Sequence, residues 1–328
     1  SDVKPLYIES AGFDPYLNLA LEKYLFDGVS DGEVILYLWQ NERTVVCGRN
    51  QNVYKECRIA RLEEDGGHLA RRLSGGGAVF HDLGNLNFTF IAREAEYDLA
   101  RQLGVITAAC RSFGVPAQIS GRNDILADGK KFSGNAFYKS MGTRYHHGTI
   151  MVDVDFSRLS DYLNVDRSKL QAKGVDSVRS RVVNLKSFNA DIDISGMKRA
   201  LKAAFEEAYG GRAAIIPADG VPADELESRR EYFRSDEWLF GKKADFSNVI
   251  SQRFAWGDFE LHAKVEGGVI SDAVVYSDAL DEAYILNVAQ SLRGARYSPD
   301  AMIAAAALVS DGYGEQLADI AELLRQSI

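Results

Sequence analysis

Cysteine is scarce in this chain of 328 residues, which contains only Cys47, Cys57 and Cys110. An odd, widely spaced set argues against a disulfide framework and against a zinc site. None of the three lies in a glycine-flanked, basic setting of the kind that activates a thiolate. We therefore interpret each cysteine as a small buried hydrophobic residue.

Long apolar runs and an excess of positive charge are also missing. No run of eighteen apolar residues exists, and the first four residues do not begin a secretory signal, so we expect a cytoplasmic protein without a membrane span. The 38 basic and 47 acidic residues give a formal net charge of −9. This charge disfavours nucleic acid and anionic membranes as partners, and no helix-turn-helix or stripe of aromatic residues is present. A phosphate-bearing ligand would need a local basic cluster.

The length predicts about two domains, and the composition is that of an ordinary globular protein. Asp14-Pro15 is typical of a helix start, with Asp as the cap and Pro at the first helical position. The apolar runs 34–39 and 44–47 predict a hairpin, and so does Asp128-Gly129 between 125–127 and the segment from 131. The pattern changes after about residue 248, where two predicted strands and three predicted helices form a compact α+β unit. We expect domains at 1–247 and 248–328.

The most informative stretch runs from Arg71-Arg72 through Gly75-Gly76-Gly77 to His81-Asp82. Successive glycines leave the backbone N–H groups open to a ligand, and the arginines add bidentate donors. The stretch therefore favours oxyanions as ligands. The stretch is neither a Walker A loop nor a dinucleotide fingerprint. The alternative interpretation is a flexible hairpin tip without a ligand, and the paired arginines argue against it.

Several further segments, taken with this stretch, resemble the lipoate–protein ligase A family over essentially the whole chain. The matching segments are Asn18-Leu19-Ala20 with Glu22, Gly48-Arg49-Asn50-Gln51-Asn52, Gly121-Arg122-Asn123-Asp124, Lys131-Phe132-Ser133-Gly134-Asn135-Ala136, His146-His147-Gly148-Thr149, Lys173-Gly174-Val175, 177–184, Phe246-Ser247 and 253–257. The resemblance implies a biotin/lipoate-ligase-like fold, related to class II aminoacyl-tRNA synthetases. It would combine a large α+β catalytic domain, with mixed and antiparallel sheets flanked by helices, and a small C-terminal accessory domain.

The resemblance also implies the site. Lys131 takes the position of the family's active-site lysine. We assign ATP and lipoyl-AMP binding to Arg72, Ser74, Gly75, Gly76, Gly77, Ala78, Val79, Phe80, Asn123, Asp124, His147, Thr149, Lys173, Arg179 and Arg181. The lipoate pocket is assigned to Trp39, Arg72, Gly77 and Lys131, and a magnesium ligand to Asp124. Core packing competes as an interpretation for Trp39 and Phe80, a satisfied histidine for His147, and an Asx turn for Asp124.

The implied activity is ATP-dependent formation of lipoyl-AMP from (R)-lipoate with Mg²⁺, followed by transfer to a lysine of an acceptor. The implied acceptors are apo lipoyl domains of 2-oxoacid dehydrogenase E2 subunits and the glycine-cleavage H protein, and we expect a monomer. Three alternatives remain open: a lipoyl or octanoyl transferase of the same fold with a cysteine nucleophile, a ligase that accepts only preformed lipoyl-AMP, and a non-catalytic ligand-binding or regulatory protein.

Overall fold

The computed structural model describes residues 2–121, 123–164, 181–241 and 246–328. The chain forms two compact units. The first contains Ser1–Val46, Cys57–Ala70 and Val79–Leu239. The second contains Cys47–Glu56, Arg71–Ala78 and Phe240–Ile328, so it includes the glycine-rich stretch together with the C-terminal residues. The α+β class expected from the sequence is confirmed.

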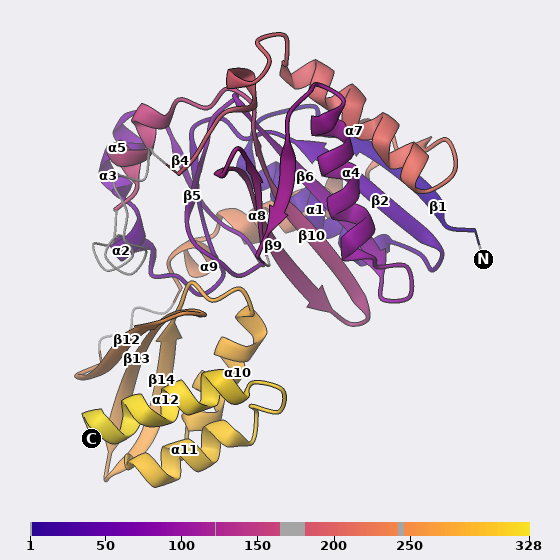
Figure 1. Ribbon diagram of the computed structural model, residues 1–328. Helices are drawn as coiled ribbons and strands as arrows, with labels where there is room; N and C mark the ends of the chain where they lie inside the picture. The colour runs from indigo at the N-terminus through magenta and orange to yellow at the C-terminus, as the bar shows by residue number, and fades with distance from the viewer. Residues whose placement is uncertain (1, 122, 165–180, 242–245) are drawn as a thin grey trace. The chain divides into compact units, whose positions relative to one another are not determined.

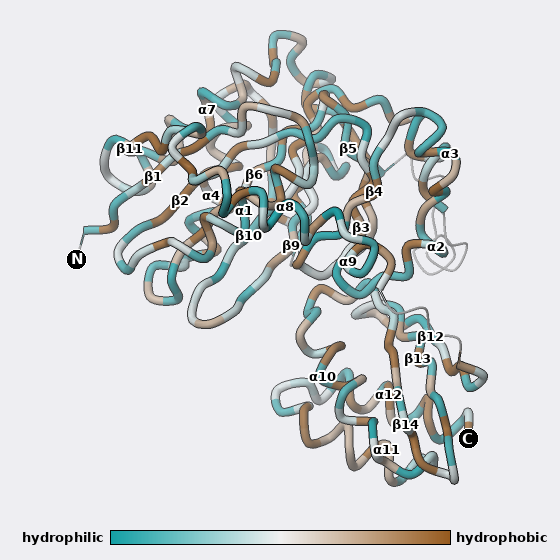
Figure 2. The backbone as a smooth tube through the Cα atoms, turned by 180° about the vertical axis from the view of Figure 1, so that it is seen from behind, coloured by the Kyte–Doolittle hydropathy of each residue, from teal (hydrophilic) through white to brown (hydrophobic). Residues whose placement is uncertain are grey.

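The first unit is built on an eight-stranded mixed sheet of order β11-β1-β2-β6-β10-β9-β8-β7 (Figure 1). In that order the strands are Ala214–Ile215, Lys4–Glu9, Glu33–Trp39, Asn85–Arg93, Thr143–Met151, Lys130–Ser140, Asp124–Ala127 and Ala117–Ser120. The pairs β1·β2 and β1·β11 are parallel, and the rest are antiparallel. Strand β2 is apolar along nearly its whole length, as its brown trace in Figure 2 shows. A continuous apolar run is typical of a strand that is covered on both faces of its sheet.

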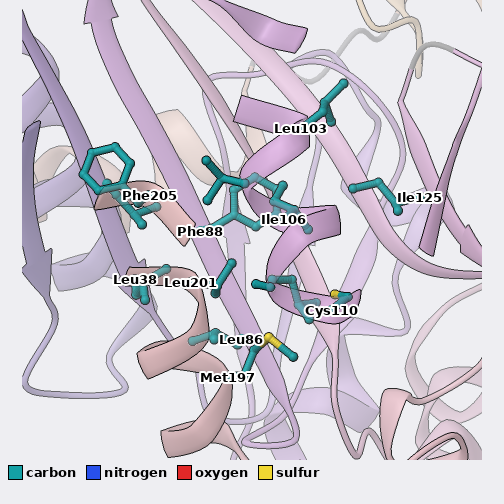
Figure 3. Packing of buried hydrophobic residues seen from close by; sticks show 14 of the residues in the cluster. Leu38, Leu86, Phe88, Leu103, Ile106, Cys110, Ile125, Met197, Leu201 and Phe205 are labelled. Carbon is teal, nitrogen blue, oxygen red and sulfur yellow. The ribbon is translucent and has the colours of Figure 1, made fainter. Parts of the chain in front are cut away.

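A core fills the space between one face of this sheet and two helices, α4 (Leu99–Arg111) and α7 (Ile194–Ala208). Figure 3 shows side chains of both helices meeting Leu38, Phe88 and Ile125 of the strands. Helix α1 (Pro15–Gly28) packs against β6 and β10, and α8 (Ala223–Arg234) packs against α1. Asp14 caps α1 as the sequence predicted, accepting hydrogen bonds from the N–H groups of Tyr16 and Leu17.

The predicted hairpin of 34–39 and 44–47 is wrong. Strand β2 pairs with β1 and β6 of the large sheet, whereas β3 (Thr44–Cys47) lies between β4 (His68–Arg71) and β5 (Val79–His81) in a second sheet. The other predicted hairpin is confirmed. Asp128 and Gly129 adopt φ of 51° and 72°, the left-handed conformation of a tight turn between β8 and β9.

The short helices α3 (Ile59–Glu64) and α5 (Leu159–Tyr162) belong to the first unit, and α2 (Val53–Glu56) belongs to the second. Helix α9 (Asp236–Phe240) lies where the chain passes from the first unit to the second. The C-terminal part of the second unit has a three-stranded sheet of β12 (Asn248–Phe254), β13 (Gly257–Glu266) and β14 (Val269–Tyr276). Helices α10 (Glu282–Leu292), α11 (Pro299–Ala307) and α12 (Gly314–Ser327) pack with this sheet around a separate apolar core. Over the described ranges, no helix is both long and apolar enough to cross a membrane.

Candidate active site

Lys131 stands near the start of β9, where its ammonium pairs with Asp124 of β8. The Lys131 Nζ lies 3.0 Å from Asp124 Oδ1, and both side chains are about one-third exposed. The atoms form an ion pair rather than an aligned hydrogen bond. A Cβ built on Gly134 would lie 3.0 Å from the Lys131 Nζ, so the ammonium rests on bare backbone. This places a charged donor, about one-third exposed, at a fixed point on the sheet.

The backbone around Lys131 is fixed by neighbouring groups. The Lys131 N–H donates to the Arg181 carbonyl at 2.8 Å, and the Val183 N–H donates to the Lys131 carbonyl at 2.9 Å. The Thr149 hydroxyl accepts a hydrogen bond from the Gly134 N–H at 3.1 Å. Lys131, Asp124, Thr149 and Arg181, predicted to share a site, are therefore brought together.

Asn135 holds Asn123, and with it the adjacent Asp124, against β9. Its backbone N–H and its side-chain amide both donate to the Asn123 carbonyl, at 2.8 Å and 3.1 Å. In the part of the chain that the structure describes, no group accepts from the buried Nη2 of Arg181. A buried guanidinium nitrogen without an acceptor suits an anionic ligand group.

Trp39, predicted for the lipoate pocket, and His147, predicted for ATP and lipoyl-AMP binding, belong to one buried hydrogen-bonded chain on the opposite side of β6 from α4. The Trp39 indole N–H donates to Thr89 Oγ1 at 3.0 Å, and the Thr89 hydroxyl donates to Glu22 Oε2 at 2.6 Å. His147 Nδ1 lies 2.9 Å from the same carboxylate oxygen. Glu22 is 2% exposed, so these hydrogen bonds take the place of water around its carboxyl group. Sequence reasoning missed Glu22 and Thr89 as functional candidates; a charged residue on the apolar face of α1 was the available signal.

His146 links helix α4 to this part of the sheet. Its Nε2 lies 2.6 Å from Asn135 Oδ1, and its Nδ1 lies 3.2 Å from Gln102 Oε1. A neutral imidazole donates from one nitrogen and accepts at the other. Both contacts are with amide oxygens, which only accept, and the shorter one assigns the N–H to Nε2, donating to Asn135 Oδ1. The imidazole therefore supports Asn135 in its neutral form.

Acidification should destabilise the fold through His146. Burial, with a smaller contribution from His147, lowers the pKa of His146 to about 3. The unfolded chain takes up this proton near pH 6.5 and the folded chain does not, so stability is lost as pH falls below about 6.5. Between pH 6.5 and 5.0 the free energy of unfolding should fall by about 2 kcal/mol from this group. Urea unfolding at both pH values should give a smaller fall for His146→Gln; an equal fall in both proteins would contradict the assignment.

In the second unit, the glycine-rich stretch is organised by its two arginines. Arg72 Nη2 donates to the carbonyls of Gly75 and Gly77, both at 2.7 Å. Arg71 Nη1 donates to the carbonyls of Gly48, Arg49 and Gln51 at 2.7–3.1 Å. Gly48, part of a matched segment in the sequence, must be glycine here, because its Cβ would lie 2.1 Å from the Gly76 oxygen.

Two of the glycines face the chain's own C-terminal residues within this unit. The Gly76 N–H donates to the Ala279 carbonyl at 3.0 Å, and a Cβ on Gly75 would lie 2.4 Å from that oxygen. The Gly76 N–H, expected from the sequence to be open to an oxyanion, is therefore engaged here. Gly77 is different: nothing lies within 4 Å of its Cβ position.

Comparison with known proteins decides the family. The model of the lipoyl protein ligase A/B catalytic domain matches residues 14–206, more than half of the chain, and the model of the bacterial lipoate protein ligase C-terminus matches residues 243–324. The chain belongs to the lipoyl protein ligase A/B family. The family resemblance read from the sequence is confirmed.

Solved structures of lipoate ligases share the fold. LipL1 of Plasmodium falciparum, solved with lipoate, is 28% identical, with a TM-score of 0.86 over 98% of this chain and 99% of that one. A bipartite lipoate protein ligase of Thermoplasma acidophilum, studied with its E2 lipoyl domain, is 27% identical, with a TM-score of 0.62 over 74% and 98%. Lipoate-protein ligase A bound with ATP is 25% identical, with a TM-score of 0.61 over 74% and 99%.

The remaining predicted residues of this lipoyl protein ligase family member fall into four groups. Ala78 directly precedes β5 in the sequence and is half-buried. Val79 and Phe80 lie on β5, where Phe80 packs against the ring of Tyr162 with centroids 5.3 Å apart. Ser74 is buried, and its carbonyl accepts from the Arg49 N–H at 2.9 Å. Lys173 and Arg179 lie outside the described residues.

The cysteines fit a ligase better than a thioester-forming transferase of the same fold. All three are buried and free of disulfides. Burial raises the pKa of both the Cys47 and the Cys110 thiols to about 12. A thiol of that pKa is almost wholly protonated at neutral pH and is a poor nucleophile.

Asp124 by itself makes a poor metal site. Across the described residues, no three His, Cys, Asp or Glu side chains are grouped to hold a metal ion, and Asp124 is already paired with Lys131. Mg²⁺ commonly uses one or two carboxylates with substrate phosphates. Asp124 fits Mg²⁺ only when nucleotide phosphates supply the other ligands, and the assignment stays a prediction.

Proposed function

We propose that the chain is an ATP-dependent lipoate–protein ligase. The lipoate carboxylate attacks the α-phosphate of ATP, the bond to the β-phosphate breaks, and pyrophosphate leaves. The ε-amine of an acceptor lysine then attacks the carbonyl of lipoyl-AMP, loses a proton, and AMP leaves. The observation that carries the proposal is the Lys131 ammonium, held beside Asp124 on the bare backbone of Gly134.

The chemistry of these groups suits both half-reactions. Joining a carboxylate to a phosphate brings two anions together, so catalysis consists mainly of charge neutralisation and alignment. Lysine is a compact point charge that can serve the carboxyl oxygen and the α-phosphate together. In the second step the same ammonium polarises the acyl carbonyl, and Arg181 adds a donor for phosphate.

We assign Trp39 and His147 to the lipoate end of the site and the stretch from Arg72 to Phe80 to the nucleotide. The Glu22–Thr89–Trp39 hydrogen bonds give the indole one fixed orientation. The ligases with bound lipoate and bound ATP support both ligands for this chain. The acceptors we propose are lipoyl domains of 2-oxoacid dehydrogenase E2 subunits and the glycine-cleavage H protein. The Thermoplasma ligase, which was studied with its E2 lipoyl domain, supports an acceptor of this kind.

Two assays test this function. Lipoate-dependent exchange of labelled pyrophosphate into ATP should be seen without an acceptor, and label from lipoate should pass to an apo lipoyl domain when one is added. Transfer from synthetic lipoyl-AMP without any pyrophosphate exchange would identify instead a ligase that uses the preformed adenylate. Transfer from a lipoylated or octanoylated carrier protein without ATP would identify a transferase.

A further inference from the structure

The last strand of the large sheet, β7, leaves part of its outer edge open. At its start the edge is closed by the chain itself, because the Ala117 N–H donates to the Val115 carbonyl at 2.9 Å and the Ala117 carbonyl accepts from Arg111 at 2.8 Å. These bonds show that the backbone groups of Ala117 point away from β8. In an antiparallel pair, outward and inward residues alternate. The N–H and C=O of Ile119 therefore also point outward.

The described part of the chain leaves Ile119 about half exposed. No described group bonds its outward N–H or C=O, and its side chain is 49% exposed. Natural edge strands are usually protected by charged residues, proline or a bulge. The segment Ala117–Ser120 has no charged side chain and no proline. This edge is open to an added strand at Ile119.

The register places this edge beside Lys131. Gln118 pairs with Leu126, which pairs with Lys131, and Ser120 pairs with Asp124. Directly opposed residues share a face of the sheet, so Gln118 and Ser120 lie on the face that carries the Lys131–Asp124 ion pair. Ile125 lies on the other face, toward α4 (Figure 3). A strand added to β7 would therefore extend the same surface on which Lys131 stands.

We propose that the edge of β7 at Ile119 receives an extended segment of the acceptor protein, next to the lysine to be modified, as an added strand. The inference rests on the ligase function proposed above. Such a strand would lie three strand spacings from β9, about 14 Å away. The Lys131 side chain already reaches from β9 to Asp124 on β8. The four-carbon side chain of the acceptor lysine would span much of the remaining distance.

Two substitutions at one position test the added strand. Ile119→Pro removes only an N–H that β8 does not use, and Ile119→Lys puts a charge on the edge. Both should raise KM for an apo lipoyl domain about tenfold and leave kcat nearly unchanged. Lipoate-dependent pyrophosphate exchange, measured without acceptor, should stay at the wild-type level. Ile215→Lys is the matched control, since Ile215 is an exposed isoleucine on the opposite edge strand, β11, and should change neither quantity.

The outcomes separate the possibilities. A wild-type acceptor KM in both Ile119 variants would overturn the proposal, and so would a parallel loss of pyrophosphate exchange, which would mean that the edge is needed for the fold. A rise in KM equal to that of Ile215→Lys would also overturn it. Absence of pyrophosphate exchange in the wild-type chain would refute the ligase function itself, a result distinct from any effect of Ile119.

Discussion

Replacement of Lys131 by alanine should lower the rate of lipoate adenylation roughly 10²–10³-fold, equivalent to about 3–4 kcal/mol of transition-state stabilisation. The physical reason is the position of its ammonium, which is paired with Asp124 and seated on Gly134 where no side chain separates it from a ligand. Lipoate-dependent pyrophosphate exchange measures the effect on the first half-reaction. Transfer from synthetic lipoyl-AMP measures the second, and we expect it to fall as well.

The adjacent Lys130 provides the control. It is the first residue of β9 and is exposed, and Lys130→Ala should keep nearly full activity. Lys131→Arg should lose adenylation activity as Lys131→Ala does, because a planar guanidinium does not replace a compact ammonium that serves two oxygens. Equal exchange activity in Lys130→Ala and Lys131→Ala would remove Lys131 from the centre of the reaction.

Local chemistry explains which parts of the fold could be predicted from the sequence. The Asp14 cap and the turn at Asp128-Gly129 depend on side chains within a few residues of one another, and both form as expected. The partners of β2 depend on distant strands. Its apolar residues on both faces indicate a central strand with two neighbours, and this signal outweighs the four-residue spacing to β3 that had suggested a hairpin.

Helix α8 was missed because its sequence gives no apolar stripe. Only Phe233 is buried in this polar helix, and Pro222 at its N-cap provides no side-chain hydrogen bond. Its contacts with α1 and the residue before it include ion pairs, such as Arg230 with Asp14 at 3.0 Å and Arg229 with Asp27 at 3.0 Å. Contacts of this kind leave no periodic signature in the sequence.

In the candidate site, too, contacts between neighbouring residues could be predicted and contacts between distant residues could not. Lys131, Asp124 and Thr149 were found through motifs, and the structure brings them together with Gly134. Asn135 was within a matched motif, but its role required knowing that β9 passes beside Asn123. The engagement of the Gly76 N–H by Ala279 could not be read from the sequence, because the two residues are about two hundred positions apart.

Gly48→Ala should disrupt the glycine-rich stretch. The added Cβ would lie 2.1 Å from the Gly76 carbonyl oxygen and 3.4 Å from Arg72 Nη2, so backbone must move. Overpacking of this kind costs about 1–3 kcal/mol of stability. A displacement of about 1 Å in a group that positions substrate costs on the order of 10² in rate, so pyrophosphate exchange should fall by that factor if Arg72 holds the nucleotide.

The matched substitution in the same stretch is Gly77→Ala, because no atom lies within 4 Å of that Cβ position. Thermal unfolding should therefore show a lower midpoint for Gly48→Ala and a wild-type midpoint for Gly77→Ala. The two variants also distinguish an effect on the fold from an effect on nucleotide binding. If the nucleotide passes over Gly77, the new methyl group should weaken ATP binding in a calorimetric titration while the unfolding midpoint stays unchanged. Wild-type stability and activity in Gly48→Ala would show that the Gly48–Gly76 approach does not shape the site.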